Sequence, residues 1–376
     1  MPDVVIAGAG PAGAVAATVL ARAGVQVLVL DRARFPRPKL CGDTVNPGAL
    51  AILTRLGLDA AVDGGLPIDG MIVTSERVRV VGRYDGMQGR SIARQDLDAA
   101  LVRLAREAGA EIQEGVLVDA PVVESRNGAP RVVGLTTKCE GGLPRRIDAR
   151  LVIAADGRYS RVARALHLSR SPRRPRRWAI GAYFTDVAGL TAFGEMHVRS
   201  GHYLGVAPLP GGLANACLVV SARRALRDPS TLLLEAICTD RRLAGRFASA
   251  RMLGVAACLG PLAVECSAGG MAGLLLAGDA GGFVDPMTGD GLRFAFRGGE
   301  LAALEALHAL EHGVEAAHVR LLAARREAFG RKWRFNRGLR SLAGSPVAAR
   351  AAAFGAAVAP AILRRVIRYA GDADAA

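Results

Sequence analysis

The stretch Val4-Val5-Ile6-Ala7-Gly8-Ala9-Gly10-Pro11-Ala12-Gly13 decides the fold of this chain. Its first four residues are apolar, as in a buried strand, and three glycines follow in the spacing GxGxxG. Residues typical of a helix run from Ala14 to Ala23, and a second apolar strand, Val25–Leu30, ends next to Asp31. A strand, a glycine turn, a helix and a strand in this order predict a βαβ unit.

The glycines of this turn and Asp31 have the properties that a dinucleotide site requires. Gly8 permits the tight turn, Gly10 lets a pyrophosphate approach the backbone, and Gly13 lets helix and strand pack closely. The N-terminus of the helix offers free N–H groups to phosphate, and Asp31 can accept hydrogen bonds from ribose hydroxyls. The alternative is an ordinary glycine turn with a solvated Asp31, and the pattern alone does not separate FAD from NAD. We predict cofactor contacts at Gly8, Gly10, Ala12, Gly13, Asp31 and Arg32.

The rest of the chain shows two kinds of strand pattern. Apolar and polar residues alternate in residues 71–92 and 178–220, as in half-buried antiparallel strands. Residues 151–155 and 274–277 are fully apolar, as in a parallel sheet, and an amphipathic helix is expected over residues 95–108. These patterns predict an α/β fold with an α+β second domain.

The same patterns predict the division into domains. We expect a discontinuous, Rossmann-like nucleotide-binding domain formed by residues 1–70, 93–170 and 265–305. An antiparallel-sheet substrate domain, residues 71–92 and 171–264, interrupts it. The chain is rich in Ala and Arg after Leu301, and a C-terminal helical region is expected over residues 306–376.

Composition excludes several classes of protein. The net charge of +15 comes almost wholly from arginine, since three of the 49 basic residues are lysines. Aromatic residues make up 5% of the chain and no nucleic-acid-binding motif occurs, so no nucleic-acid partner is expected. The cysteines and histidines have no metal-ligand spacing, and no metal site is predicted. Without a membrane-spanning apolar run or a secretory leader, we expect a cytoplasmic protein.

Two later segments follow predicted strands and carry further Gly and Asp residues. The first contains Asp156-Gly157, and the second runs from Gly278-Asp279 to Gly289-Asp290-Gly291. Together with the first turn, these residues resemble the FAD-dependent superfamily typified by p-hydroxybenzoate hydroxylase, and the resemblance implies an FAD-binding domain. It further implies that Gly278-Asp279 holds the ribityl chain of FAD and that Gly289 and Gly291 approach its isoalloxazine ring.

Within that superfamily, Arg34–Asp43 and Asp285–Gly291 resemble the geranylgeranyl reductase branch. The resemblance implies that Cys41 passes beside the isoalloxazine, where its thiol packs on the flavin, tunes its potential or is attached to it covalently. Lys39 is expected either to contact the cofactor or to be solvated. Val118, at the end of a short strand, is expected either to meet the adenine or to be a core residue. From these segments we predict further cofactor contacts at Lys39, Cys41, Gly42, Arg94, Val118, Asp156, Gly157, Gly278, Asp279, Gly289 and Gly291.

The substrate pocket is predicted from the same resemblance. Geranylgeranyl reductases carry a signature Tyr-x-Trp-x-Phe-Pro, and the corresponding segment here is Tyr203–Pro208. Gly205 and Ala207 replace the two large aromatic residues, which would open the pocket wall to a broader substrate. A halogenase is not expected, because its Trp-x-Trp-x-Ile-Pro motif is missing. We predict substrate contacts at Tyr203, Gly205, Ala207, Pro208 and Pro286.

These patterns predict an FAD-dependent oxidoreductase. The leading hypothesis is a monooxygenase that hydroxylates a hydrophobic aromatic or polyketide-like small molecule. NADH or NADPH would bind transiently as reductant, because the chain has no second GxGxxG in a βαβ setting. Two alternatives stay open: a reductase or dehydrogenase of carbon–carbon double bonds in an isoprenoid, and an electron-transfer flavoprotein that contacts a membrane through its basic C-terminal helices. Candidate catalytic residues are Cys41, His202 and Tyr203.

Overall fold

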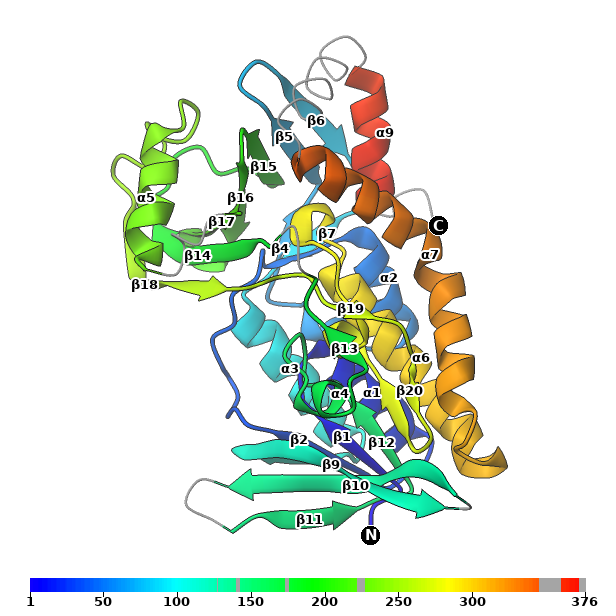
Figure 1. Cartoon of the computed structure of the whole chain (residues 1–376). Coiled ribbons are helices and arrows are strands. Elements are labelled where there is room, and N and C mark those ends of the chain that lie inside the picture. Colours follow the sequence, from blue (N-terminus) through cyan, green and yellow to red (C-terminus); the bar gives the residue numbers. More distant parts are fainter. Residues whose placement is uncertain (127, 140–142, 173–175, 222–226, 345–359, 372–376) are drawn as a thin grey trace.

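The predicted βαβ unit is present in the computed structural model, which describes residues 1–126, 128–139, 143–172, 176–221, 227–344 and 360–371 (Figure 1). It consists of β1 (Val4–Ala7), α1 (Pro11–Arg22) and β2 (Val27–Asp31). β1 pairs in parallel with β2 and with β12 (Leu151–Ala154). All three strands are buried, as their apolar sequences predict.

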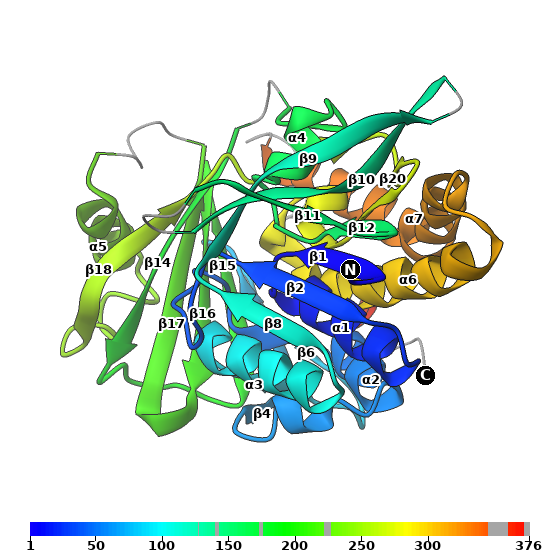
Figure 2. The same cartoon turned by 90° about the horizontal axis from the view of Figure 1, so that it is seen from below.

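These strands lie in a six-stranded sheet with the order β20-β21-β12-β1-β2-β8. Helices share a hydrophobic core with one face of the sheet, and a separate three-stranded sheet packs on the other face (Figure 2). The remaining strands of the six-stranded sheet are β8 (Glu111–Glu114), β20 (Gly270–Met271) and β21 (Leu274–Leu276). The helices are α1, α3 (Arg94–Glu107), α6 (Gly291–His312) and α7 (Ala317–Gly344).

The three-stranded sheet corrects one sequence prediction. It contains β9 (Val116–Arg126), β10 (Ala129–Cys139) and β11 (Arg145–Asp148). Val118 therefore lies near the start of an eleven-residue strand and not at the end of a short one. The polar and proline residues after Val118 interrupt the apolar pattern, so the sequence understates the strand that pairing with β10 produces.

The predicted antiparallel strands of the second domain form a seven-stranded sheet with the order β18-β14-β17-β16-β15-β5-β6. β5 pairs in parallel with β15, which joins segments far apart in the sequence into one sheet. The strands are β5 (Gly70–Thr74), β6 (Arg79–Arg83), β14 (Trp178–Thr185), β15 (Phe193–Arg199), β16 (His202–Leu209), β17 (Leu213–Val220) and β18 (Arg251–Leu259).

Small elements connect these layers. β7 (Gly89–Ser91), at the end of the predicted substrate-domain segment 71–92, pairs with β3 and β4 and not with the seven-stranded sheet. The small elements are β3 (Thr44–Val45), α2 (Pro47–Arg55), β4 (Leu66–Ile68), α4 (Arg161–Ala165), β13 (Ser169–Arg170), α5 (Pro229–Thr239) and β19 (Glu265–Cys266).

The C-terminal helical region begins earlier in the chain than the sequence predicts. α6 starts at Gly291 and runs through the predicted domain boundary at residue 305, because its first turns pack on α1. The last described helix is α9 (Pro360–Gly371), and residues 345–359 and 372–376 of the predicted helical region lie outside the described residues. No helix within the described ranges is long and apolar enough to cross a membrane.

Candidate functional site

A cavity of about 1640 Å³ lies where the six-stranded sheet meets the seven-stranded sheet. The ends of β1, β2, β12 and β21 open into it, because the carboxyl ends of parallel strands meet at one edge of a sheet. Predicted substrate residues that line the cavity are Tyr203, Gly205, Ala207 and Pro286. Predicted cofactor residues that line it are Gly8, Gly10, Ala12, Asp31, Arg32, Lys39, Cys41, Gly42, Arg94, Val118, Asp156, Gly157, Gly278, Asp279, Gly289 and Gly291.

The turn from β1 into α1 has no room for side chains at two of its glycines. Gly8 has a φ of +97°, and a Cβ atom there would lie 2.6 Å from the Ala155 carbonyl oxygen. A Cβ on Gly13 would lie 1.8 Å from the Gly8 carbonyl oxygen, so Gly13 packs the helix on the turn and does not itself line the cavity. Gly10 lines the cavity, and no atom outside the turn comes closer than 3.6 Å to its Cβ position. This open helix N-terminus suits a phosphate group.

Asp31 fixes the glycine turn against the end of β2. Its Oδ2 accepts a hydrogen bond from the Ala9 amide at 2.8 Å, and its Oδ1 accepts one from the Ala33 amide at 2.8 Å. The side chain is buried and lines the cavity, so the alternative of a solvated Asp31 is wrong. Each carboxylate oxygen retains a lone pair, so Asp31 can also accept a ribose hydroxyl.

A cluster of positive side chains lies beside Asp279. The Arg158 guanidinium approaches the Asp279 carboxylate at 3.8 Å. Burial in the cavity wall, with Arg94, Arg158 and Arg37 nearby, lowers the pKa of the Lys39 ammonium to about 8, and Asp279 opposes that shift. An anionic group bound here would relieve the repulsion among these cations.

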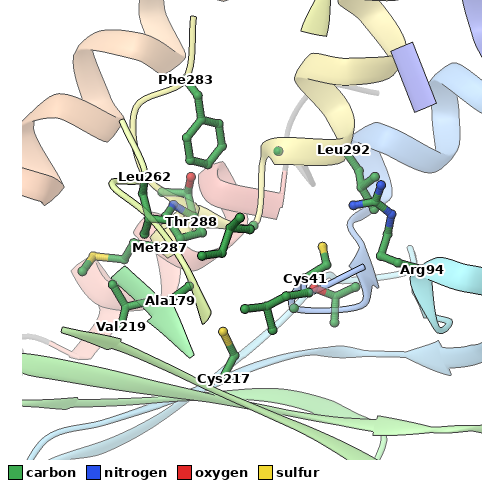
Figure 3. Close-up of a pocket in the computed structure, with 18 of the residues that line it drawn as sticks. Cys41, Arg94, Ala179, Cys217, Val219, Leu262, Phe283, Met287, Thr288 and Leu292 are labelled. Atoms are coloured by element: carbon green, nitrogen blue, oxygen red, sulfur yellow. The ribbon is translucent and has the colours of Figure 1, made fainter. Parts of the chain in front are cut away.

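Arg94 is held rigidly at the cavity wall by a contact that the sequence did not predict. Its guanidinium donates two hydrogen bonds to Asp98, at 2.8 and 2.9 Å, and Arg37 also contacts Asp98 at 3.0 Å. Burial alone would lower the pKa of Arg94, but Asp98 and the Cys41 sulfur outweigh it and raise that pKa. Figure 3 shows Cys41 between Arg94 and Cys217.

Asp43 is a buried residue that sequence reasoning did not assign to the site. It accepts hydrogen bonds from the Arg94 amide at 3.0 Å and from the Asn215 side chain at 2.6 Å. Asn215 also donates to the Cys41 carbonyl at 3.0 Å, so β17, the Cys41 loop and the start of α3 meet at this carboxyl group. Burial raises the pKa of Asp43 to about 7, while hydrogen bonds from Tyr183, Arg94 and Asn215 limit the rise.

Tyr203 is engaged in a buried network and not presented as a free proton donor. Its hydroxyl donates to Asp285 at 2.8 Å, and Arg177 contacts the other oxygen of Asp285 at 3.1 Å. Burial and Asp285 raise the pKa of Tyr203 well above its ordinary value. Asp285 also accepts from the Met287 amide, so this network fixes the turn that leads into Gly289.

The alternation of β16 decides which predicted pocket residues reach the cavity. Tyr203, Gly205 and Ala207 lie on one face of the strand and line the cavity. His202 and Pro208 do not line the cavity, although Val206 on their side of the strand does, which corrects Pro208 as a pocket residue and His202 as a candidate there. The nearest atom to a Cβ on Gly205 would be 3.8 Å away, so this wall is open, as the sequence predicts.

Within the part of the chain that the structure describes, no group of three or more His, Cys, Asp and Glu side chains is arranged to hold a metal ion. The described polar groups are instead a helix N-terminus, a carboxylate at the end of β2 and a cationic cluster, and together they match the parts of a dinucleotide.

Comparison with known proteins identifies the cofactor. The model of the FAD-binding domain family matches residues 1–334. The chain belongs to this family. It is an FAD-dependent oxidoreductase of the p-hydroxybenzoate hydroxylase-like superfamily and belongs to the geranylgeranyl reductase branch, as its sequence motifs predict.

Related proteins of this family align over most of the chain. Menaquinone reductase of Mycobacterium tuberculosis is 31% identical over 80% of this chain and 75% of that protein. Digeranylgeranylglycerophospholipid reductase 1 of Methanopyrus kandleri is 32% identical over 82% of this chain and 81% of that protein.

Solved structures show the same fold at lower identity. A geranylgeranyl bacteriochlorophyll reductase-like protein from Thermoplasma acidophilum matches with a TM-score of 0.79 at 23% identity, covering 91% of this chain and 87% of that one. A flavin-dependent brominase matches with a TM-score of 0.80 at 21% identity, covering 98% of this chain and 93% of that one.

FAD fits the donor set of this cavity. The glycine turn and helix N-terminus would hold its pyrophosphate, Asp31 its adenosine ribose, and Asp279 its ribityl chain. The cavity continues past Asp279 to Cys41, Gly289 and Gly291, where the isoalloxazine would lie.

Asp279→Ala should weaken FAD binding while the protein stays folded. The substitution removes an acceptor for ribityl hydroxyls, and one lost charge-assisted hydrogen bond lowers affinity roughly 10- to 100-fold. Fluorescence titration of the apoprotein with FAD measures the change, with Asp63→Ala, an exposed residue outside the cavity, as control. Equal affinity of Asp279→Ala and the parent would show that Asp279 does not contact the cofactor.

Asp43→Asn should change the pH dependence of stability. The folded-state pKa of Asp43 is about 7 and its ordinary value is 3.8. Its contribution to stability is therefore full below about pH 4 and is lost as the pH rises through about 7. The Tm of the variant relative to the parent should rise between about pH 4 and pH 7 and stay level above that range, whereas Asp63→Asn should show no such trend. A Tm difference that is constant with pH would contradict the titration of Asp43.

Proposed function

We propose that this oxidoreductase reduces a carbon–carbon double bond or quinone ring in a lipophilic, isoprenoid-bearing substrate. The observation that carries the proposal is an apolar chamber that continues the cofactor cavity away from Asp279. Apolar side chains from two strands and from α9 line this chamber: Met71, Val73, Met196, Val198, Leu363, Val366 and Ile367.

The lining of the chamber favours a substrate with an apolar chain. Its walls come from β5 and β15, which pair with each other, and from α9, which packs beside β6. The chamber belongs to the same cavity as Cys41 and Gly205, so an apolar chain held in it can bring a double bond to the flavin end. Apolar walls of this kind bind by removing hydrocarbon from water and leave regiochemistry to the few polar groups near the flavin.

The relatives support reduction over hydroxylation. The menaquinone reductase and the digeranylgeranylglycerophospholipid reductase are each at least 31% identical to this chain over four fifths of its length. Both names specify a reductase and a lipid substrate. The brominase resembles this chain in fold at 21% identity, which carries no argument about activity.

FAD bound in this cavity supplies the electron pair for the reduction. The side chains supply position and protons. Saturation of a double bond also requires a proton, and the Cys41 thiol, which lines the cavity, is the candidate donor. Tyr203 lines the same cavity, but its hydroxyl already donates to Asp285. Arg94, fixed by Asp98, lies beside the Cys41 sulfur and would stabilise the thiolate that remains after proton transfer.

NADH or NADPH is the proposed reductant of the flavin. The sequence contains one GxGxxG turn in a βαβ setting, and FAD occupies it in this proposal. The nicotinamide donor would therefore bind transiently at the open side of the cavity. Arg161 and Tyr159 line the cavity and are exposed, so they are candidates to contact its phosphates and ring, and Arg161 would exchange its present ion pair with Asp119 for a phosphate.

Monooxygenation is the second candidate, and one observation favours it. Gly205 and Ala207 leave the cavity wall open where geranylgeranyl reductases carry aromatic rings, so an aromatic or polyketide-like molecule would also fit. The two activities differ in their need for oxygen, which makes them experimentally separable.

Anaerobic turnover tests the proposal. Protein with FAD and NADPH or NADH is incubated without oxygen with a menaquinone or with a geranylgeranyl lipid, and products are analysed by mass spectrometry. The proposal expects a product that has gained two hydrogens, in step with oxidation of the reductant. Turnover only in air, with labelled oxygen in the product, would support the monooxygenase and overturn the reductase.

Cys41→Ser should lower kcat about 100-fold and leave KM nearly unchanged, because it replaces the proposed proton donor without changing the shape of the chamber. Cys217→Ser is the matched control, since Cys217 lines the same cavity and burial raises the pKa of its thiol to about 12. Equal kcat values for the two variants in the anaerobic assay would contradict the role of Cys41.

A further inference from the structure

We propose that the outer end of the apolar chamber faces an anionic lipid bilayer and that α9 forms the membrane-contacting wall of its entrance. This inference rests on the proposed function, from which it takes the lipophilic, isoprenoid-bearing substrate. Membrane binding itself is measured without catalysis, so the two can fail separately. The family model ends at residue 334, before α9, so the family match does not describe this face of the molecule.

The position of α9 follows from its contacts with β6 and the residues after it. Ile367 packs on Gly82, where an added Cβ would lie 2.6 Å from the isoleucine side chain. One turn further along the helix, Gly371 packs against the ring of Tyr84, and Arg368 pairs with Asp85 at 3.1 Å. Helix and strand therefore run in the same direction. The N-terminal half of α9 lies toward the start of β6 and the preceding turn at residues 75–78 (Figure 1).

The two ends of α9 are held differently. At the C-terminal end, the buried Lys332 ammonium donates to the carbonyl groups of Tyr369 and Ala370, and Asn46 also donates to Ala370 at 3.4 Å. A cation at the last carbonyls of a helix is favourable for its dipole. Residues 360–367 make no side-chain hydrogen bond or ion pair with other described parts of the chain. Among the described residues, the N-terminal half is therefore held by apolar contacts.

The inner face of that half lines the chamber. Leu363, Val366 and Ile367 belong to the cavity wall, and Leu363 is only half-buried. On the opposite rim, the turn at residues 75–78 also lines the cavity and exposes Arg77 next to Glu76. The chamber thus reaches the surface between an apolar helix face and a polar turn.

The outer face of α9 combines an exposed apolar side chain with arginines. Ile362 is 65% exposed, and Arg364 and Arg365 are exposed without an ion pair to any described residue. An exposed isoleucine costs little if it inserts among acyl chains, while arginines beside it bind anionic headgroups. Arg325 and Lys332, which the sequence places in the same basic tail, are buried and do not contribute to this surface.

A bilayer explains the combination of these features better than a soluble partner. The chamber behind the helix is lined by apolar side chains, so a ligand that fills it would be poorly soluble in water and would reside in a membrane. An entrance against the bilayer lets such a ligand pass from lipid to protein without crossing water. No helix within the described ranges spans a membrane, so the contact would be peripheral.

Vesicle co-sedimentation of the full chain with FAD tests membrane binding. Vesicles of phosphatidylcholine are compared with vesicles that also contain phosphatidylglycerol. The proposal expects salt-sensitive binding to the anionic vesicles and roughly 20-fold weaker binding of the double variant Arg364→Gln/Arg365→Gln, since each arginine near an anionic surface contributes about fivefold.

The matched control is Arg145→Gln/Arg146→Gln, an exposed pair on β11 at the opposite end of the molecule (Figure 1). It removes the same charge and should bind as the parent does. Absence of parent binding to anionic vesicles, or equal loss in both double variants, would overturn the proposal.

A second measurement tests the entrance. Arg364→Gln/Arg365→Gln should lower kcat/KM for substrate held in anionic vesicles by about tenfold or more and leave kcat/KM for detergent-dispersed substrate unchanged. Equal activity of parent and variant on vesicle-held substrate would show that α9 is not the route of entry. Inactivity of both on every lipid would contradict the proposed function and leave the vesicle-binding result standing.

Discussion

Close packing at the turn between β1 and α1 constrains the rest of the structure. A Cβ on Gly13 would lie 1.8 Å from the Gly8 carbonyl, and one on Gly299 of α6 would lie 2.2 Å from the Ala12 carbonyl. The turn is thus enclosed by its own helix and by α6, and Asp31 fixes it from the side of β2. This packing leaves the helix N-terminus open to the cavity, which is the property that cofactor binding requires.

Two buried charge networks then bring the second sheet to the flavin end of the cavity. Asp43 connects the Cys41 loop and Arg94 to Asn215 of β17. Asp285 connects the turn before α6 to Tyr203 of β16 and to Arg177. Removing one partner of such a network is costly because a polar group is left buried and unpaired. These contacts therefore help to specify the relative position of the two sheets.

Sequence reasoning predicted the parts of this molecule that depend on local pattern. The glycine turn, Asp31 and the buried strands follow from spacing and periodicity, and the family resemblance placed the later Gly and Asp residues at the same cavity. Contacts between residues far apart in the sequence were not predictable: Asn215 holds Asp43, and α9 closes the chamber. The pair of Arg94 and Asp98 is local, because the two residues are four positions apart on α3, and this spacing is a signal that could have found it. Pro208 and His202 were expected at the site but do not line the cavity, because the part of β16 that meets the cavity is set by the packing of the whole sheet. Val118 was misplaced within its strand because long antiparallel pairing overrides local interruptions.

The central claim is that one FAD molecule binds in the cavity that starts at the Gly8 turn. The most direct measurement is the identity and amount of cofactor that the purified protein retains, read from its absorption spectrum and from chromatography after acid denaturation. The account expects a yellow protein that releases one FAD per chain, or that takes up one FAD when it is supplied. A colourless protein that binds no added FAD, or one that releases FMN or NAD in its place, would contradict the account.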